Sequence, residues 1–147
     1  MHSILILNGP NLNLLGTRQP EIYGHTTLAD IEEMCRTYAD AIGVKVAFDQ
    51  SNHEGDLVDA LHACRGVHGG VILNAGAYTH TSIALMDAIK SIDLPVVELH
   101  LSNIHAREEF RHKSYISPVA LGLICGFGAR GYTLAMDALV SHLEKAS

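Results

Sequence analysis

The chain has 147 residues, 48% of them hydrophobic, and a formal net charge of −6. This length predicts a single domain, residues 1–147, that is large enough to bury a core without disulfides. The acidic balance argues against a nucleic-acid surface. No apolar run approaches membrane-spanning length, and the first residues lack the basic region of a signal peptide. We therefore expect a soluble cytoplasmic protein with neither nucleic acid nor membrane as a partner.

The three cysteines and ten histidines point to neither disulfides nor a metal. Cys35, Cys64 and Cys125 are odd in number and far apart, which suits small buried side chains in a reducing compartment. No two histidines have the His-x-x-x-His spacing that places metal ligands on one helical face. We expect no structural metal.

The opening stretch predicts a strand followed by a ligand-binding edge. The apolar run Ile4–Leu7 breaks into Asn8-Gly9-Pro10-Asn11, as in a strand buried on both faces. Ligands of open parallel sheets bind beyond the carboxyl ends of the strands, which is where Asn11 would lie. The next segment, residues 16–24, has glycines at both ends and no hydrophobic period. It reads equally well as a lid over a site or as an ordinary surface loop.

Helices and strands alternate along the rest of the chain. Thr27 followed by Asp30 has the form of a helix start, and Gly43 is a natural stop. Further apolar patterns predict, in chain order, a strand at 44–48, a helix at about 54–65, a strand at 70–74, a helix at 81–92, strands at 95–100 and 121–125, and a helix at about 128–145. In the helix at 81–92, Ile83, Met86 and Ile89 are expected to face inward.

This alternation indicates βαβ units, and therefore a parallel sheet with helices on both faces. Five strands in so short a chain favour a flavodoxin-like, doubly wound α/β sandwich with strand order 2-1-3-4-5.

Polar residues gather where these strands end. Asn74 closes the third strand, and Glu98, His100 and Ser102 follow one another at the spacing that places them on one face of the fourth. A carboxylate beside an imidazole can fix its tautomer, which suits a general acid. The alternative is a polar strand end whose hydrogen bonds are satisfied within the protein.

Two further patterns are open to more than one interpretation. Arg107 and Arg111 would share a face if helical, either to bind an anionic or hydroxylated ligand or to pair with Glu108 and Glu109. The segment Gly126–Gly131 matches the dinucleotide pattern GxGxxG, but no strand follows its helix to carry a ribose-binding acid. We interpret those glycines as strand-to-helix packing.

Several long blocks resemble the type II 3-dehydroquinate dehydratase family over nearly the whole chain. They are Asn8–Gly16, Arg18–Gly24, Gln50–Gly55, Asn74–Ser82, Glu98–Asn103, Arg107–His112 and Gly126–Tyr132. The resemblance implies a hydro-lyase that eliminates water in trans from 3-dehydroquinate, through an enolate, to give 3-dehydroshikimate without a cofactor. It also implies a place in the shikimate pathway.

The resemblance also assigns catalytic roles. Tyr23 is expected to be the base, held as tyrosinate by Arg18, which also stabilises the transition state. His100, oriented by Glu98, is expected to protonate the departing hydroxyl, and Asn11 to help hold the water that solvates the enolate oxygen.

Substrate-binding roles follow in the same way. Asn74 and the Leu101–Ser102 segment are expected to hold the substrate carboxylate and a nearby hydroxyl. His80 and Arg111 are expected to bind the remaining ring hydroxyls.

Three other positions concern the lid and the assembly. Arg107 is expected to support the closed lid. Asp87 is expected to reach a neighbouring subunit's site, because the family assembles as trimers that stack into dodecamers. Gln19 stands where many members carry Glu, and this affects the electrostatics of the lid rather than the chemistry.

The alternative from a different class is a flavodoxin-like ligand-binding or signalling module without enzymatic activity. It predicts an acidic pocket or flavin-stacking aromatic side chains at the carboxyl edge of the sheet. The chain has no Trp, and that edge carries Asn, His and Arg instead.

Overall fold

The structure is a computed structural model. It describes residues 1–17 and 20–146, apart from the side chains of Ile22 and Tyr23. Its strands are β1 (Ser3–Asn8), β2 (Lys45–Gln50), β3 (Gly70–Asn74), β4 (Val96–His100) and β5 (Gly122–Cys125). Its α-helices are α1 (Pro20–Tyr23), α2 (Leu28–Ile42), α3 (Glu54–Ala63), α4 (Ile83–Ile92) and α5 (Arg130–Ala146). The 3-10 turns are η1 (Leu12–Leu14), η2 (Gly76–His80), η3 (Ile104–Ala106), η4 (Glu109–Arg111) and η5 (Ser117–Val119).

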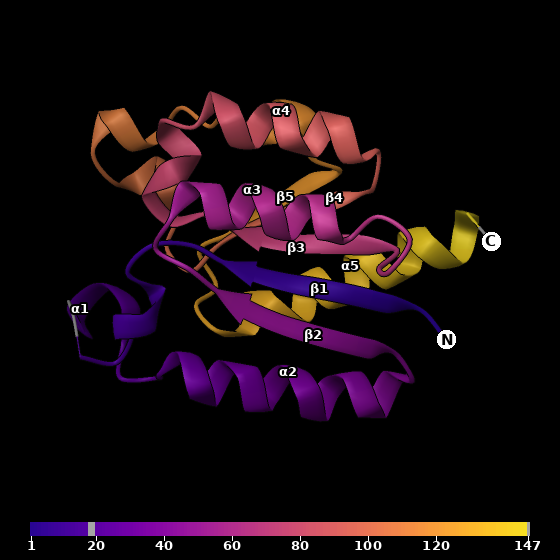
Figure 1. Ribbon diagram of the computed structural model, residues 1–147. Helices are drawn as coiled ribbons and strands as arrows, with labels where there is room; N and C mark the ends of the chain where they lie inside the picture. Colours follow the sequence, from indigo (N-terminus) through magenta and orange to yellow (C-terminus); the bar gives the residue numbers. More distant parts are fainter. Residues whose placement is uncertain (18–19, 147) are drawn as a thin grey trace.

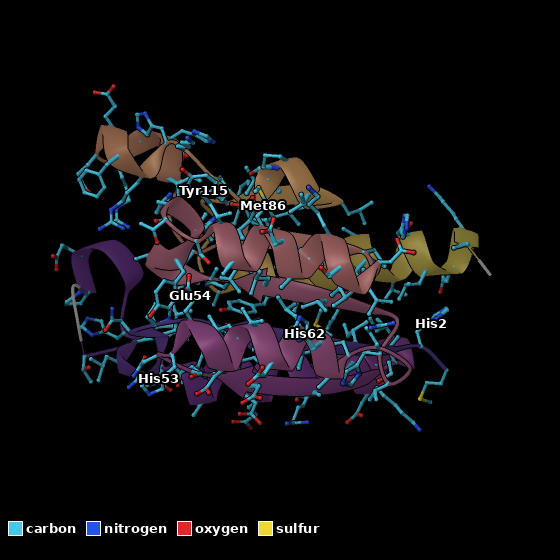
Figure 2. All side chains as sticks on the ribbon, turned by 45° about the horizontal axis from the view of Figure 1, so that its top comes forward. His2, His53, Glu54, His62, Met86 and Tyr115 are labelled. Carbon is cyan, nitrogen blue, oxygen red and sulfur yellow. The ribbon has the colours of Figure 1, made fainter. Side chains whose placement is uncertain are left out.

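All pairings within the five-stranded sheet are parallel, and the strand order is β2-β1-β3-β4-β5. Helices α2 and α5 cover one face, and α3 and α4 cover the other (Figure 1). Figure 2 shows α3 and α4 side by side, with His62 labelled on the first and Met86 on the second. The flavodoxin-like architecture predicted from the sequence is confirmed.

The predicted ends of α2 are confirmed by its hydrogen bonds. The Thr27 side chain accepts a bond from the Asp30 amide, and the Asp30 carboxylate accepts one from the Thr27 amide, which together form a capping box. At the other end Gly43 is left-handed, with φ 73°, and its amide donates to the Ala39 carbonyl. Local hydrogen bonds therefore fix where this helix begins and ends.

The expected inward face of α4 is partly wrong. The Ser82 hydroxyl accepts from the Leu85 amide, so the helix begins at Ile83. Its buried residues are Leu85, Ala88, Ile89 and Ile92. Ile83 is 53% exposed, because a residue two positions before Leu85 lies about 200° around the helix from it.

All three cysteines are free thiols. Cys35 and Cys64 are buried in the core, and Cys125 is only partly buried. Burial raises the pKa of the Cys35 thiol to about 12 and that of Cys64 to about 11. The expectation of three buried side chains is therefore wrong for Cys125.

Among the described residues, none of the helices is both long and apolar enough to cross a membrane.

The alternation of side chains divides the polar strand ends between the two faces of the sheet. Asn8 and Asn74 are paired in register and follow the parity of Ile6 and Ile72, which pack on the α2–α5 side. Glu98 and His100 have the opposite parity and lie on the α3–α4 side. A ligand at this edge can therefore be contacted from both layers.

The glycines at 126–131 pack the strand-to-helix connection. A Cβ added at Gly131, the second residue of α5, would lie 2.9 Å from Cδ1 of the fully buried Leu99 on β4. A Cβ at this position therefore fits only if the packed Leu99 side chain shifts.

We predict opposite effects for alanine at two matched helical glycines. Gly131→Ala should destabilise the protein by about 1–3 kcal/mol, the usual cost of overpacking a core. Gly55→Ala, at the second residue of α3, meets no atom within 4 Å and should be neutral or stabilising by up to about 1 kcal/mol. Urea denaturation of both variants measures the difference. Equal stabilities would contradict the packing role.

Candidate active site

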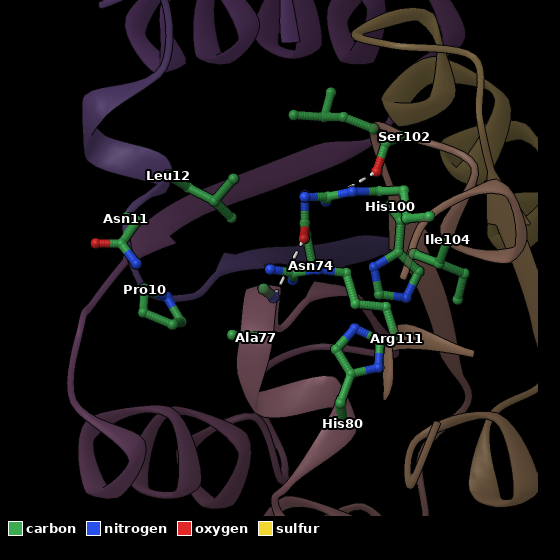
Figure 3. A pocket seen from close by; sticks show the side chains of 13 residues that line it. Pro10, Asn11, Leu12, Asn74, Ala77, His80, His100, Ser102, Ile104 and Arg111 are labelled. Atoms are coloured by element: carbon green, nitrogen blue, oxygen red, sulfur yellow. Dashed lines mark hydrogen bonds between the residues drawn. The ribbon is translucent and has the colours of Figure 1, made fainter. Parts of the chain in front are cut away.

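A pocket of about 160 Å³ lies beyond the carboxyl ends of β1, β3 and β4 (Figure 3). Drug-sized ligands usually occupy more than roughly 300 Å³, so this pocket suits a small molecule. Its lining includes Asn11, Asn74, His80, His100, Leu101, Ser102, Arg107 and Arg111. Residues that are far apart in the sequence and that were expected to act together are therefore brought together here.

The predicted pairing of Glu98 with His100 is confirmed. His100 Nε2 lies 2.6 Å from Glu98 Oε2, and Glu98 is only 1% exposed. The carboxylate also accepts hydrogen bonds from the Ser114 hydroxyl, at 2.9 Å, and from the Ser117 hydroxyl. Burial by itself raises the pKa of Glu98, but the hydrogen bonds from His100, Ser117 and Ser114 outweigh it, and the pKa lies below its ordinary value. Glu98 is therefore ionised at neutral pH.

The ionised carboxylate sets the tautomer of His100. Because a carboxylate can only accept, Nε2 carries a proton, and Nδ1 is the ring nitrogen left to meet a ligand. His80 is fixed in the opposite sense, since its Nδ1 lies 2.7 Å from the Lys113 carbonyl and must donate to it. The two rings stack with centroids 6.2 Å apart (Figure 3).

The charge state of His80 follows from its surroundings. Burial lowers its pKa, the hydrogen bond to the Lys113 carbonyl partly opposes this, and His100 and Arg111 nearby lower it further. His80 is therefore neutral near pH 7, with Nε2 able to accept a hydrogen bond from a hydroxyl group.

The two arginines enter the pocket from irregular backbone rather than from one helix. Arg107 follows η3, and Arg111 ends η4. Arg111 Nε lies 2.6 Å from Glu108 Oε2, while Arg107 Nη1 lies 3.5 Å from Ser102 Oγ. Both arginines contact Glu108, so that part of the pairing interpretation is confirmed. Both also line the pocket, and ligand binding by them stays a prediction. Their positive charge suits an anionic or hydroxylated ligand.

Asn11 is held in an uncommon backbone conformation. Its φ of 67° and ψ of −4° are left-handed, a region that asparagine tolerates better than most residues. Its amide donates to Asn52 Oδ1 at 3.0 Å, and the Gln50 side chain donates to the Gly9 carbonyl. The loops after β1 and β2 are thus tied together beside the pocket.

Some of the expected site residues lie elsewhere or are not described. Asp87 is exposed on α4 and does not line the pocket of its own chain. Arg18 and Gln19 lie outside the described residues, and so does the side chain of Tyr23 at the end of α1. The flanking Gly16 and Gly24 have φ of 88° and 75°, so both ends of the expected lid turn at positions that favour glycine.

Sequence reasoning missed several residues that support the site. Ser114, in the loop after η4, and Ser117, the first residue of η5, bind Glu98. Tyr132 binds Asn8 and Asn74 from α5. These partners are distant in sequence, and no local motif marks them. Among the residues described, no cluster of His, Cys, Asp and Glu side chains is arranged to hold a metal ion.

Comparison with known proteins identifies what this chain resembles. The family model for dehydroquinase class II matches residues 2–140. The 3-dehydroquinate dehydratase of Dinoroseobacter shibae is 67% identical over 146 residues, covering 99% of this chain and 97% of the relative. That of Ruegeria pomeroyi is 69% identical over 144 residues, covering 98% and 97%.

Solved structures of type II dehydroquinases have a fold similar to that of this chain. The type II dehydroquinase from Butyrivibrio crossotus is 41% identical, with a TM-score of 0.92 over 94% of this chain and 97% of that one. The type II dehydroquinase from Propionibacterium acnes gives the same TM-score at 40% identity, over 96% and 97%.

The buried carboxylate predicts a pH-dependent contribution to stability. Because the folded pKa of Glu98 is lowered, its ionised form stabilises the protein above the unfolded pKa, and this contribution is lost as pH falls through the folded value. The stability difference between wild type and Glu98→Gln should therefore shrink from about pH 5 downward. Glu32→Gln, which loses only an exposed pair with Arg36, is a control expected to cost at most about 1 kcal/mol at pH 7. A difference for Glu98→Gln that stays constant from pH 7 to pH 3 would contradict this.

Proposed function

The chain belongs to the dehydroquinase class II family, the type II 3-dehydroquinate dehydratases, and from this premise we propose that its pocket removes water in trans from 3-dehydroquinate, through an enolate, to give 3-dehydroshikimate. The proposed setting is the shikimate pathway towards chorismate and the aromatic amino acids, in the cytoplasm. Residues 1–147 act as one catalytic domain in this proposal. The non-enzymatic alternative is set aside, because the relatives are dehydratases.

One observation carries the proposal. An imidazole bonded to a buried, ionised carboxylate stands in a small pocket lined by arginine, histidine and asparagine. Elimination beside a carbonyl needs a base, an acid and stabilisation of the enolate. His100, bonded to Glu98 through Nε2, supplies the acid when Nδ1 is also protonated, and it gives that proton to the departing hydroxyl.

The base in this proposal is Tyr23. A phenol has a pKa near ~10 in water, so a neighbouring positive charge is needed to keep it ionised at neutral pH. Arg18, in the same segment 16–24, is assigned that role, and the segment acts as the lid. Asn11 holds the water that solvates the enolate oxygen, in line with its place on the pocket wall.

The remaining pocket residues bind the substrate. Asn74 and the Leu101–Ser102 segment hold the carboxylate and a nearby hydroxyl, and His80 and Arg111 hold the other ring hydroxyls. All of these residues line one pocket, which supports the assignment. Arg107, beside Ser102, supports the closed lid.

Asp87 completes the site of a neighbouring subunit in a homo-oligomer, which we expect to be a dodecamer built from trimers. Its exposure on α4, outside the pocket of its own chain, supports a role across a subunit boundary.

The activity is tested directly by adding 3-dehydroquinate and following the ultraviolet absorbance of the conjugated enone product. We expect a steady increase that requires the protein. No increase across a range of pH and substrate concentration would overturn the proposed function.

We predict that Tyr23→Phe abolishes turnover while substrate binding is largely retained, because only the hydroxyl is lost. Tyr38→Phe is the control: its hydroxyl bonds to Asp137 at the surface, and turnover should be unchanged. Arg18→Lys should lower kcat and move the rising limb of the pH profile to higher pH, since a point charge lacks the planar fork of arginine. Near-normal turnover by Tyr23→Phe would show that another group is the base. So would a rising limb of the pH profile that is unchanged in Arg18→Lys.

We also predict that sites are shared between subunits. Oligomers that contain only Asp87→Ala chains, or only Arg111→Ala chains, should each have reduced turnover. Co-assembly of the two chains should restore part of the activity, because some mixed boundaries combine an intact Arg111 pocket with an intact Asp87. Activity no higher than the sum of the separate variants would contradict this, as would a fully active monomer in light scattering.

A further inference from the structure

The phenol of Tyr132 lies at the centre of a buried hydrogen-bond chain beneath the pocket. Tyr132, on α5, is fully buried, and its ring packs 6.4 Å from that of Phe48 between the helix and the sheet. Its hydroxyl contacts Asn8 Oδ1 at 2.6 Å and Asn74 Nδ2 at 3.1 Å. It thereby connects the last residues of β1 and β3.

The direction of every bond in this chain is determined. The Asp49 carbonyl can only accept, so it fixes the Asn8 amide with Nδ2 towards it and Oδ1 towards Tyr132. The phenol must then donate to Asn8, and its oxygen accepts from Asn74 Nδ2.

At the far end of this chain, Asn74 Oδ1 accepts from the Gly76 amide at 3.3 Å. The Asn74 amide therefore cannot flip without breaking a bond at both of its ends.

This determines what Asn74 presents to a ligand. Asn74 lines the pocket, and one N–H of its amide is used by Tyr132, which leaves the second N–H for a ligand acceptor. Without the phenol, two buried amides would lose a partner, and Asn74 could rotate away from its present orientation. Burial raises the pKa of Tyr132, so the phenol remains a neutral donor rather than a base.

We propose that Tyr132 is a positioning residue, which holds the Asn74 amide in the orientation that donates to the substrate, without touching the substrate itself. The inference rests on the proposed function in one respect, the role of Asn74 in binding 3-dehydroquinate. It extends the site by two fully buried residues, Tyr132 and Asn8, which reach it from the opposite side of the sheet to Glu98.

A double-mutant cycle separates positioning from a general structural role. Tyr132→Phe should raise KM and lower kcat/KM roughly tenfold, as for the loss of one hydrogen bond, with kcat little changed. In an Asn74→Ala background the same change should alter kcat/KM less than about twofold, because the group being positioned is already gone. An equal loss in both backgrounds would contradict the proposal. Tyr38→Phe, which loses a surface phenol bond, is the matched control.

A second variant guards against loss of folding. Tyr132→Phe combined with Asn8→Leu replaces both partners of one buried bond by apolar groups, which costs less than leaving one unpaired. In this variant Asn74 still lacks its hydrogen bond to the Tyr132 hydroxyl. The value of kcat/KM should therefore fall by the same factor as in Tyr132→Phe. Recovery of wild-type kcat/KM would contradict positioning.

An independent readout does not use turnover. In the free protein, the Asn74 side-chain amide should give two sharp proton resonances, identified by their absence in Asn74→Ala. Tyr132→Phe should shift or broaden them, and unchanged resonances would contradict the inference. A wild-type protein inactive on 3-dehydroquinate would contradict the proposed function alone, because the orientation of Asn74 is still measured by this spectrum.

Discussion

The site depends on one buried charge, the carboxylate of Glu98. Removing a carboxylate from water is costly unless its oxygens are hydrogen-bonded. Here His100 comes from the same strand, while Ser114 and Ser117 come from the loop that precedes β5. Satisfying the carboxylate therefore fixes an imidazole, and it also ties that loop to the carboxyl end of β4.

The sheet allows two independent polar systems to meet at one edge. Successive residues of a strand face opposite layers, so the Glu98–His100 pair lies on the α3–α4 side of the sheet, while the asparagines of β1 and β3 lie on the α2–α5 side. Hydrogen bonds within the protein hold each system in place: His100, Ser114 and Ser117 bond to Glu98, and Tyr132 bonds to Asn8 and Asn74. One system places an imidazole at the pocket and the other an amide, and the protein's own hydrogen bonds hold both side chains.

Much of this could be predicted from the sequence because it is encoded locally. Apolar runs bounded by turn residues placed the strands, Thr27 and Asp30 placed a helix start, and the two-residue spacing of Glu98 and His100 placed them on one face. The expected inward face of α4 was wrong at Ile83, because this residue lies about 200° around the helix from the buried Leu85.

The supporting shell could not be predicted in the same way. Tyr132 meets Asn8 across 124 positions, and Ser117 meets Glu98 across 19, and no spacing rule marks such pairs. From the sequence alone, a tyrosine among apolar residues of a helix, such as Tyr132, is predicted only to pack in the core. The roles assigned to Tyr23 and Arg18 came from the family resemblance and remain predictions.

The central claim is that Glu98 holds the proton of His100 on Nε2 and leaves Nδ1 to act on the substrate. Nitrogen-15 NMR of the free protein, with the His100 signals identified by their loss in a His100→Ala variant, tests it most directly. In the neutral ring, the account predicts a protonated Nε2 and an unprotonated Nδ1. A neutral ring protonated at Nδ1 instead would contradict the account, because Glu98 would then have no proton to accept from His100.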